Sequence, residues 1–297
     1  MENKLVTVRV ISYNAASTIV ETLDSIKAQT YQNIELIVSD DCSKDDTVEI
    51  ARKWIEENKT RFVRTELLTV PQNTGVCANL NRAIKASRGE WIKGIAADDI
   101  LLPDCISDFV NYVNDNKEAL FVAGLQKEYN GTFEEKNYIR TSGHIAPKYS
   151  ALSSSEQLKK IAFGLSLAAP AVFMNRKLLE DIGGYDERYG YEDHPLYISI
   201  LERGHKIYYL PKETVGYRIH ESTMHASCKL FNPKFLPHIK KFQTERVFQY
   251  YDFRQKLSLR LTWSFQDFLE SVHLNNETPL MKVIYQKIMA VFFYIGK

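Results

Sequence analysis

The sequence of 297 residues has little cysteine, no strong excess of charge and no long apolar run. Its four cysteines lie far apart without a Cys-x-x-Cys pair, which argues against a disulfide framework or a zinc site and fits a reducing compartment. A net charge of +1 with scattered basic residues gives no case for nucleic-acid binding. No apolar stretch predicts a membrane span, and a strand follows the N-terminus almost directly, so we expect no signal peptide and a cytoplasmic protein.

Two common nucleotide-binding patterns are also missing. The chain has neither Gly-x-Gly-x-x-Gly nor Gly-Lys followed by Ser or Thr, which excludes a dinucleotide fingerprint and a P-loop. What is present is ordinary globular material, with 44% hydrophobic and 25% charged residues. The length suits one α/β domain, with or without an appendage.

Strands and helices are predicted to alternate through the first third of the chain. Apolar, β-branched runs at 5–12, 34–39, 66–70 and 91–97 predict strands, and segments with helical spacing follow them. This alternation implies a parallel sheet with right-handed crossovers. The carboxyl ends of such strands meet at one edge, where open α/β sheets bind their ligands.

Asp98 and Asp99 directly follow the strand at 91–97 and are the central candidates for chemistry. Adjacent carboxylates repel each other unless a cation or hydrogen-bond donors compensate them. Oxygen ligands favour a hard divalent ion, Mg²⁺ or Mn²⁺, shared with phosphate oxygens. The alternative is that both are loop residues that cap the next helix, which Pro103 opens.

Polar residues follow the other strands as well. Tyr13 can stack on a planar ring, although an aromatic side chain at a strand end is more often rim packing. Asp41 is either an acceptor for an imide N–H of a base or a helix N-cap. Asn73 and Gly75 resemble a tight turn that feeds a helix N-terminus, a useful place to hold a nucleotide.

Later segments carry further candidates. Glu192 and Asp193 open a helix, where they either stabilise the helix end or supply a base at a pocket edge. Arg218 and His220 follow a strand two positions apart, so both can face one side, although an isolated histidine is usually structural or exposed. The aperiodic segment 128–155 predicts a variable loop or short hairpin over the site.

Several motifs, in order over residues 5–225, together resemble those of the family 2 inverting glycosyltransferases, which have the GT-A fold. They are Val10-Ile-Ser-Tyr-Asn14, the Asp-Asp-x-Ser-x-Asp-x-Thr pattern at 40–47, Asn73-Thr-Gly75 with Asn81, the Asp-x-Asp region at 96–103, Tyr191-Glu-Asp193 and Tyr217-Arg-Ile-His220. In the Asp-x-Asp region the first carboxylate is replaced by Ala96, which puts the grip on the ribose and diphosphate in question, while Asp98 and Asp99 remain.

The resemblance implies an α/β fold with a Rossmann-like, mostly parallel sheet flanked by helices over residues 1–230. Beyond it, where the match fades, helical spacing of apolar residues predicts a helical C-terminal extension over 231–297. It implies Asp193 as the catalytic base with Glu192 beside it, and a divalent ion, Mn²⁺ or Mg²⁺, on Asp98 and His220. The residues that it places at the nucleotide are Ser12, Tyr13, Asn14, Asp41, Asn73, Gly75, Asn81, Ala97, Asp99 and Arg218.

The predicted function is therefore inverting transfer of a sugar from a nucleotide-sugar, with a UDP-sugar favoured. The acceptor would be a hydroxyl of a saccharide or lipid-linked saccharide in cell-surface polysaccharide synthesis. One alternative is a nucleotidyltransferase, although Ser12-Tyr13-Asn14 is not a basic phosphate loop. Another is a non-catalytic module that binds a sugar nucleotide or glycan, which the alanine at position 96 makes plausible.

Aromatic and apolar residues recur at helical spacing through the last 60 or so residues. We expect helices that pack on the catalytic domain or on a second copy of the chain, which leaves a homodimer open. The alternative is peripheral contact with the inner face of a membrane, through the amphipathic stretch that contains Leu280, Val283, Ile284, Ile288 and Phe292.

Overall fold

The computed structural model describes residues 3–219, 230–276 and 278–296. The chain forms two compact units, Met1–Arg218 and Ile219–Lys297, which are described separately. The domain boundary near residue 230 stays a prediction.

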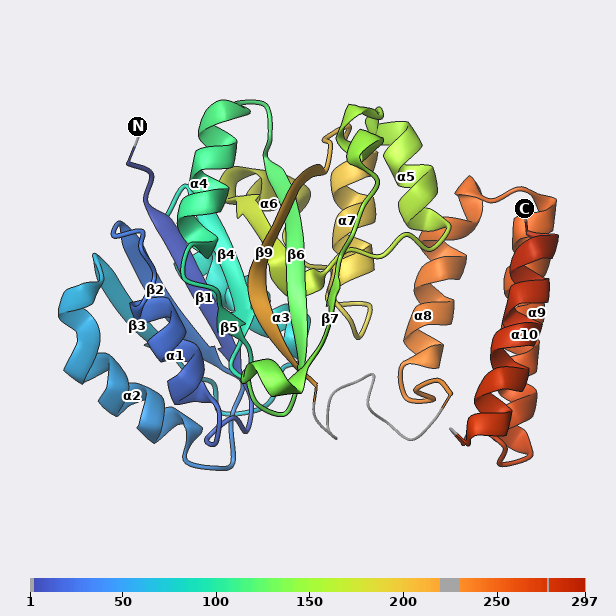
Figure 1. Ribbon diagram of the computed structural model, residues 1–297, viewed down its shortest axis with the longest axis horizontal. Helices are drawn as coiled ribbons and strands as arrows, with labels where there is room; N and C mark the ends of the chain where they lie inside the picture. The colour runs from blue at the N-terminus through green and yellow to red at the C-terminus, as the bar shows by residue number, and fades with distance from the viewer. Residues whose placement is uncertain (1–2, 220–229, 277, 297) are drawn as a thin grey trace. The chain divides into compact units, whose positions relative to one another are not determined.

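The first unit is built on one mixed sheet with the strand order β3-β2-β1-β4-β8-β6-β9-β5, to which β7 adds on β6 (Figure 1). The strands β3, β2, β1 and β4 are mutually parallel, whereas β8, β6 and β7 continue the sheet with antiparallel pairs. This confirms the predicted α/β sheet, with the parallel part confined to the N-terminal strands. The bounds are β1 Val6–Ser12, β2 Ile34–Asp40, β3 Arg64–Leu68, β4 Trp91–Ala96, β5 Ile100–Leu101, β6 Phe121–Asn130, β7 Tyr138–Ser142, β8 Val172–Asn175 and β9 Tyr208–Ile219.

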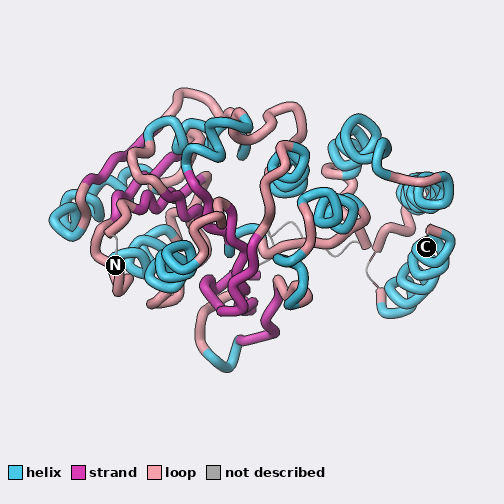
Figure 2. The backbone as a smooth tube through the Cα atoms, turned by 90° about the horizontal axis from the view of Figure 1, so that it is seen from above, coloured by secondary structure: helices cyan, strands magenta, loops and turns pink. Residues whose placement is uncertain are grey.

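Helices cover both faces of this sheet (Figure 2). Every second residue of β1, namely Val6, Val8 and Val10, is fully buried in one core with apolar residues of α1, α2 and α4. Helix α3 also packs on β1 and β2, and helix α6 contacts β8. The bounds are α1 Ile19–Lys27, α2 Thr47–Asn58, α3 Val76–Ala86, α4 Cys105–Asp115, α5 Ser154–Ala162, α6 Arg176–Ile182 and α7 Asp193–Glu202.

Two segments differ in detail from the simplest sequence interpretation. The segments 206–210 and 214–217 each have the apolar, β-branched pattern of a strand, and in the structure one continuous strand, β9, runs through both because no turn interrupts it. The start of the aperiodic segment forms the predicted hairpin, in which β6 pairs antiparallel with β7 and Gly131, with φ +76°, lies in the connection.

The second unit is helical, as predicted. It contains α8 Leu236–Phe242, a π-helical turn Gln243–Val247, a 3₁₀ turn Phe248–Tyr250, α9 Phe253–Ser271 and α10 Pro279–Ile295. The last two helices pack together through aromatic rings. The centre of the Phe265 ring lies 6.2 Å from the ring centres of both Tyr285 and Phe292. Within the described ranges, we find no helix with the length and apolar character that a membrane crossing requires.

Candidate active site

Strand register brings the predicted site residues to one edge of the sheet. Ser12 lies opposite Asp40 on β2, and Ile11 lies opposite Ala96 on β4. The carboxyl ends of the three parallel strands are therefore level, and the segments that follow them emerge side by side.

The turn after β1 is held by the turn after β2. The Ser12 hydroxyl donates to Asp40 Oδ2 over 2.9 Å, and the Asn14 amide donates to Ser43 Oγ over 2.8 Å. Asn14 has φ +52°, a left-handed conformation that asparagine tolerates better than most residues. Ser12 and Asn14 thus fix the turn, while the Tyr13 side chain between them is 49% exposed and available for stacking.

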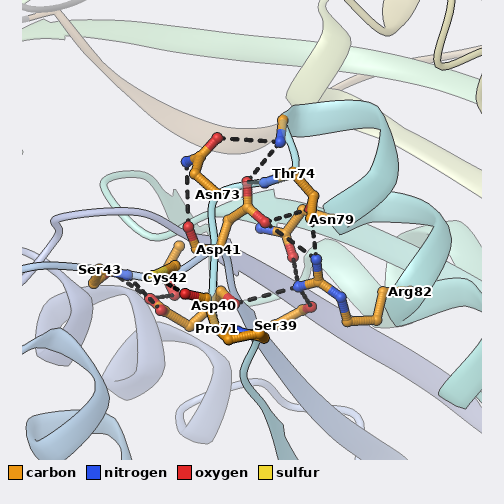
Figure 3. A network of polar contacts seen from close by, with 12 residues as sticks. Ser39, Asp40, Asp41, Cys42, Ser43, Pro71, Asn73, Thr74, Asn79 and Arg82 are labelled. Carbon is orange, nitrogen blue, oxygen red and sulfur yellow. Dashed lines mark hydrogen bonds and ion pairs between the residues drawn. The ribbon is translucent and has the colours of Figure 1, made fainter.

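Asp41 is surrounded by donors (Figure 3). Its Oδ2 accepts from the amides of Thr74, at 3.0 Å, and Gly75, at 2.7 Å. Its Oδ1 accepts from Thr74 Oγ1, at 2.5 Å, and from Arg82 Nη2, at 3.1 Å. Burial alone would raise the pKa of Asp41, but these hydrogen bonds outweigh it and hold the pKa below its ordinary value. In this conformation the carboxylate fastens the loop before α3, and its contact with a base stays a prediction.

The other members of this loop have matching roles. The Asn73 side chain donates to the Asp41 carbonyl over 3.2 Å and accepts from the Gly75 amide over 3.2 Å. Gly75 has φ +88° and precedes the first residue of α3. Sequence analysis missed Arg82, which also donates to the Asp40 carbonyl at 3.2 Å. The sequence did contain a sign of this role, because Arg82 lies about two turns into the helix that starts at this edge.

Asn81 clamps the segment that leads to Glu192 and Asp193. Its Oδ1 accepts from the Tyr185 amide over 2.8 Å, and its Nδ2 donates to the Tyr185 carbonyl over 2.9 Å. Gly184, with φ +75°, makes this approach possible, because a Cβ there would lie 2.5 Å from Asn81 Oδ1. Arg9 donates to the Tyr185 hydroxyl from β1, beneath the same segment. Asn81 is a positioning residue in this arrangement, and its contact with a nucleotide stays a prediction.

Glu192 and Asp193 lie at the start of α7. Asp193 Oδ1 accepts from the His194 amide over 2.7 Å. Burial, followed by the negative charge of Asp193, raises the pKa of Glu192 to about 7. A carboxyl group with a pKa near neutrality can exchange protons at physiological pH, as general acid–base chemistry requires.

Asp98 and Asp99 differ in burial although they are adjacent. Asp99 is buried, its Oδ1 accepts from the Arg218 amide over 2.8 Å, and burial together with the charge of Asp98 raises its pKa. Asp98 is partly exposed and is the more accessible carboxylate. Before them, Ala97 is buried and donates from its amide to the Ile11 carbonyl, which joins this turn to β1.

Arg218 is buried and engaged by protein groups. Its Nε donates to the Asp98 carbonyl over 2.8 Å, its Nη1 donates to the Gly131 carbonyl, and its Nη2 forms an ion pair with Glu21. The guanidinium also lies 4.3 Å from the centre of the Phe133 ring. Every nitrogen of this side chain, which was predicted to lie at the nucleotide, therefore already has a protein partner.

Tyr217, which sequence analysis named within a motif but gave no role, lies near members of both carboxylate pairs. Burial raises the pKa of its hydroxyl, and the charges of Asp99, Asp98, Glu128 and Glu192 raise it further. Such effects require proximity, so Asp98, Asp99 and Glu192 all lie within electrostatic reach of one hydroxyl. The signal available in the sequence was the tyrosine directly before Arg218.

A divalent ion would depend on few protein ligands. Among the described residues, no three His, Cys, Asp or Glu side chains converge as a metal site. The predicted ligand His220 lies outside the described residues. Asp98 fits the chemistry in part, because Mg²⁺ is commonly held by one or two carboxylates together with substrate phosphates.

Asp41→Asn should weaken the fold, because an amide cannot accept from all four donors around this position. We expect a loss of about 2–4 kcal/mol in the free energy of unfolding near neutral pH, measured by urea denaturation. Because the pKa of Asp41 is lowered on folding, its contribution is present above the unfolded value near about 4 and is lost as the pH falls through the folded value. Asp46→Asn, at an exposed position without a side-chain cap, is the matched control. Equal free energies of unfolding for the two variants would contradict the conclusion that the Asp41 carboxylate fastens the loop before α3.

Glu192→Gln should stabilise the protein at alkaline pH. The raised pKa means that the folded state binds more protons than the unfolded state between about pH 4.5 and 7, so the wild type loses stability as the pH rises through that window. From about pH 5 to pH 8 we expect the wild type to lose about 1–2 kcal/mol relative to the variant, measured by urea denaturation at both pH values. Parallel pH profiles for the two proteins would show that Glu192 has an ordinary pKa.

Solved structures of other proteins share the architecture of this chain. The structure of S. aureus TarS residues 1–349 in complex with UDP-GlcNAc aligns with a TM-score of 0.63 and 18% identity, over 98% of this chain and 81% of that one. The mannosyltransferase PcManGT from Pyrobaculum calidifontis, in complex with GDP-Man and Mn²⁺, aligns with a TM-score of 0.64 and 19% identity, over 100% and 86% of the two chains. At these identities the likeness establishes the fold, which is that of GT-A proteins.

Relatives in sequence are glycosyltransferases. The chain is 26% identical over 225 residues to the Escherichia coli UDP-Glc:alpha-D-GlcNAc-diphosphoundecaprenol beta-1,3-glucosyltransferase WfaP, a match that covers 75% of this chain and 81% of WfaP. An uncharacterised glycosyltransferase of Rickettsia typhi is 28% identical over 73% of this chain, which spans 65% of that protein's length. A Rickettsia felis relative is 31% identical over 66% of this chain, and the match spans only 31% of that relative's length. Residues 7–183 match the family Glycosyl transferase family 2, and because this match covers more than half of the chain, the protein belongs to that family.

Proposed function

We propose that this protein is an inverting glycosyltransferase that moves a sugar, a hexosyl or N-acetylhexosaminyl group, from a nucleotide-sugar to an acceptor hydroxyl. The observation that carries the proposal is that two carboxylate clusters, Asp98–Asp99 after β4 and Glu192–Asp193 at the start of α7, approach one side chain, because the charges of Asp98, Asp99 and Glu192 all act on the Tyr217 hydroxyl. One cluster has the oxygen chemistry to hold a metal–diphosphate, and the other has a carboxyl whose charge changes near neutral pH.

A UDP-sugar is the favoured donor, and a saccharide or lipid-linked saccharide in cell-surface polysaccharide synthesis is the favoured acceptor. The name of WfaP specifies a UDP-glucose donor and a diphosphoundecaprenol-linked acceptor, and the TarS structure holds UDP-GlcNAc. On this chain, Tyr13 would stack on the base from its exposed position. The other residues proposed to line the nucleotide are Ser12, Asn14, Asp41, Asn73, Gly75, Asn81, Ala97, Asp99 and Arg218.

The chemistry divides between the two clusters. A divalent ion, Mn²⁺ or Mg²⁺, proposed on Asp98 and His220, would neutralise charge on the departing diphosphate. Asp193 would take the proton of the acceptor hydroxyl as its oxygen bonds to the anomeric carbon. The bond from that carbon to the phosphate oxygen breaks, and its electron pair leaves with the diphosphate. Inversion needs only this one base, on the face opposite the leaving group. Glu192 lies beside it as a second carboxyl group.

The donor and the metal can be tested together by release of free nucleoside diphosphate from a panel of nucleotide-sugars with Mn²⁺, Mg²⁺ or EDTA. We expect slow hydrolysis of one UDP-sugar that EDTA abolishes. Asp98→Asn should raise the metal concentration needed for half-maximal release by at least about tenfold, since even indirect partners of a metal ligand are worth about that much. Asp115→Asn, at an exposed position on α4, should behave as the wild type.

No release, combined with no metal-assisted UDP binding, would overturn the enzyme proposal. An unchanged metal requirement in Asp98→Asn would reassign the ligand role.

Asp193→Asn should retain nucleotide binding and lose transfer, by about 10²–10⁴-fold in kcat, because the amide cannot accept the acceptor proton. The measurement pairs steady-state rates with UDP affinity by calorimetry. Asp181→Asn, at an exposed position on α6, controls for the removal of one carboxylate from the first unit. Near-normal transfer by Asp193→Asn would exclude Asp193 as the base.

A further inference from the structure

The last helix, α10, carries two apolar stripes on different sides. Its inner stripe, which includes Tyr285, Ile288 and Phe292, is half-buried and packs on α9 through Phe265. Gln266 of α9 donates to the Tyr285 hydroxyl over 2.9 Å, which fixes this side of the helix. The inner stripe therefore accounts for the packing of α10 within its own unit.

The second stripe faces away from α9. It consists of Leu280, Val283, Ile284, Lys287, Val291 and Tyr294, which recur three or four positions apart and so lie on one side of the helix. All six side chains are exposed, and the exposed fraction of the apolar ones runs from 38% at Ile284 to 79% at Tyr294. We call this side the outer stripe. An apolar strip of this length on a surface helix marks a contact with something else.

Charge indicates what that contact is. Residues 279–295 contain two lysines and no acidic residue, and residues 219–297 hold eleven Lys and Arg against six Asp and Glu. Residues 1–218 have the opposite balance, with 27 Lys and Arg against 31 Asp and Glu. An apolar stripe within a basic unit is complementary to a surface that is both apolar and negatively charged. A bilayer that contains anionic lipids has both properties.

Lys287 distinguishes a bilayer from a second copy of the chain. It lies in the middle of the outer stripe, so a contact between two such stripes would enclose two lysines where the helix offers no carboxylate to pair with them. At a lipid surface the same side chain can bury its methylene groups and extend its ammonium to the phosphate headgroups. We propose that the outer stripe of α10 binds the surface of a bilayer containing anionic phospholipids, with the helix lying in the plane of that surface. This proposal rests on the described helices alone and is independent of the proposed reaction.

The test is co-sedimentation of the full chain with vesicles of phosphatidylglycerol and phosphatidylcholine in equal parts, and with vesicles of phosphatidylcholine alone. The stripe variant is Ile284→Glu with Val291→Glu, and the matched control is Ser264→Glu with Gln286→Glu, which changes the net charge equally at exposed positions outside the stripe. We expect binding to the anionic vesicles that falls with added salt, at least about tenfold weaker binding by the stripe variant, and a change of less than about threefold in the control. Helix content measured by circular dichroism verifies that both variants fold.

Three results would overturn the proposal. The first is no binding of the wild type to anionic vesicles, and the second is equal binding by the stripe variant and the control. The third is a concentration-dependent dimer that the stripe variant abolishes, without vesicle binding by the wild type, which would assign the outer stripe to a second copy. None of these measurements uses a sugar donor or acceptor, so their failure leaves the test of glycosyl transfer unaffected.

Discussion

The burial of one guanidinium group organises the centre of the first unit. Arg218 reaches the turn of Asp98 and Asp99, the hairpin at Gly131 and the first helix through Glu21. A buried cation is costly unless acceptors surround it, so these three segments must be in place together. The rigidity that any substrate meets at this edge follows from that requirement, because moving one segment would leave a buried charge with missing partners.

In each carboxylate pair, the surroundings raise the pKa of one member. Burial and the charge of Asp98 raise the pKa of Asp99, and burial and the charge of Asp193 raise the pKa of Glu192. Separating the behaviour of two neighbouring carboxyl groups in this way is a general means by which one site performs both charge stabilisation and proton transfer.

Sequence patterns predicted the N-terminal strands, their parallel arrangement and the edge at which the candidate site residues gather, because these depend on local hydrophobic periodicity and on the handedness of crossovers. They could not say which polar side chains would remain available to a ligand. Asp41 and Asn81 were expected at the nucleotide, yet both bind protein groups contributed by distant segments. Tyr217 and Arg82 were given no role for the same reason, since only the folded chain brings their partners together.

Several of these contacts join residues that lie far apart in the sequence, and this separation affects how the protein folds. Arg9 and Tyr185 are 176 positions apart, and Glu21 and Arg218 are 197 apart, so the contacts that complete the site close nearly the whole unit. Chain segments so distant pay a large loop-closure entropy before they gain contacts, and topologies of this kind fold slowly. A nascent chain therefore lacks these contacts until β9 has been synthesised, so the edge that carries the candidate site is completed late in folding.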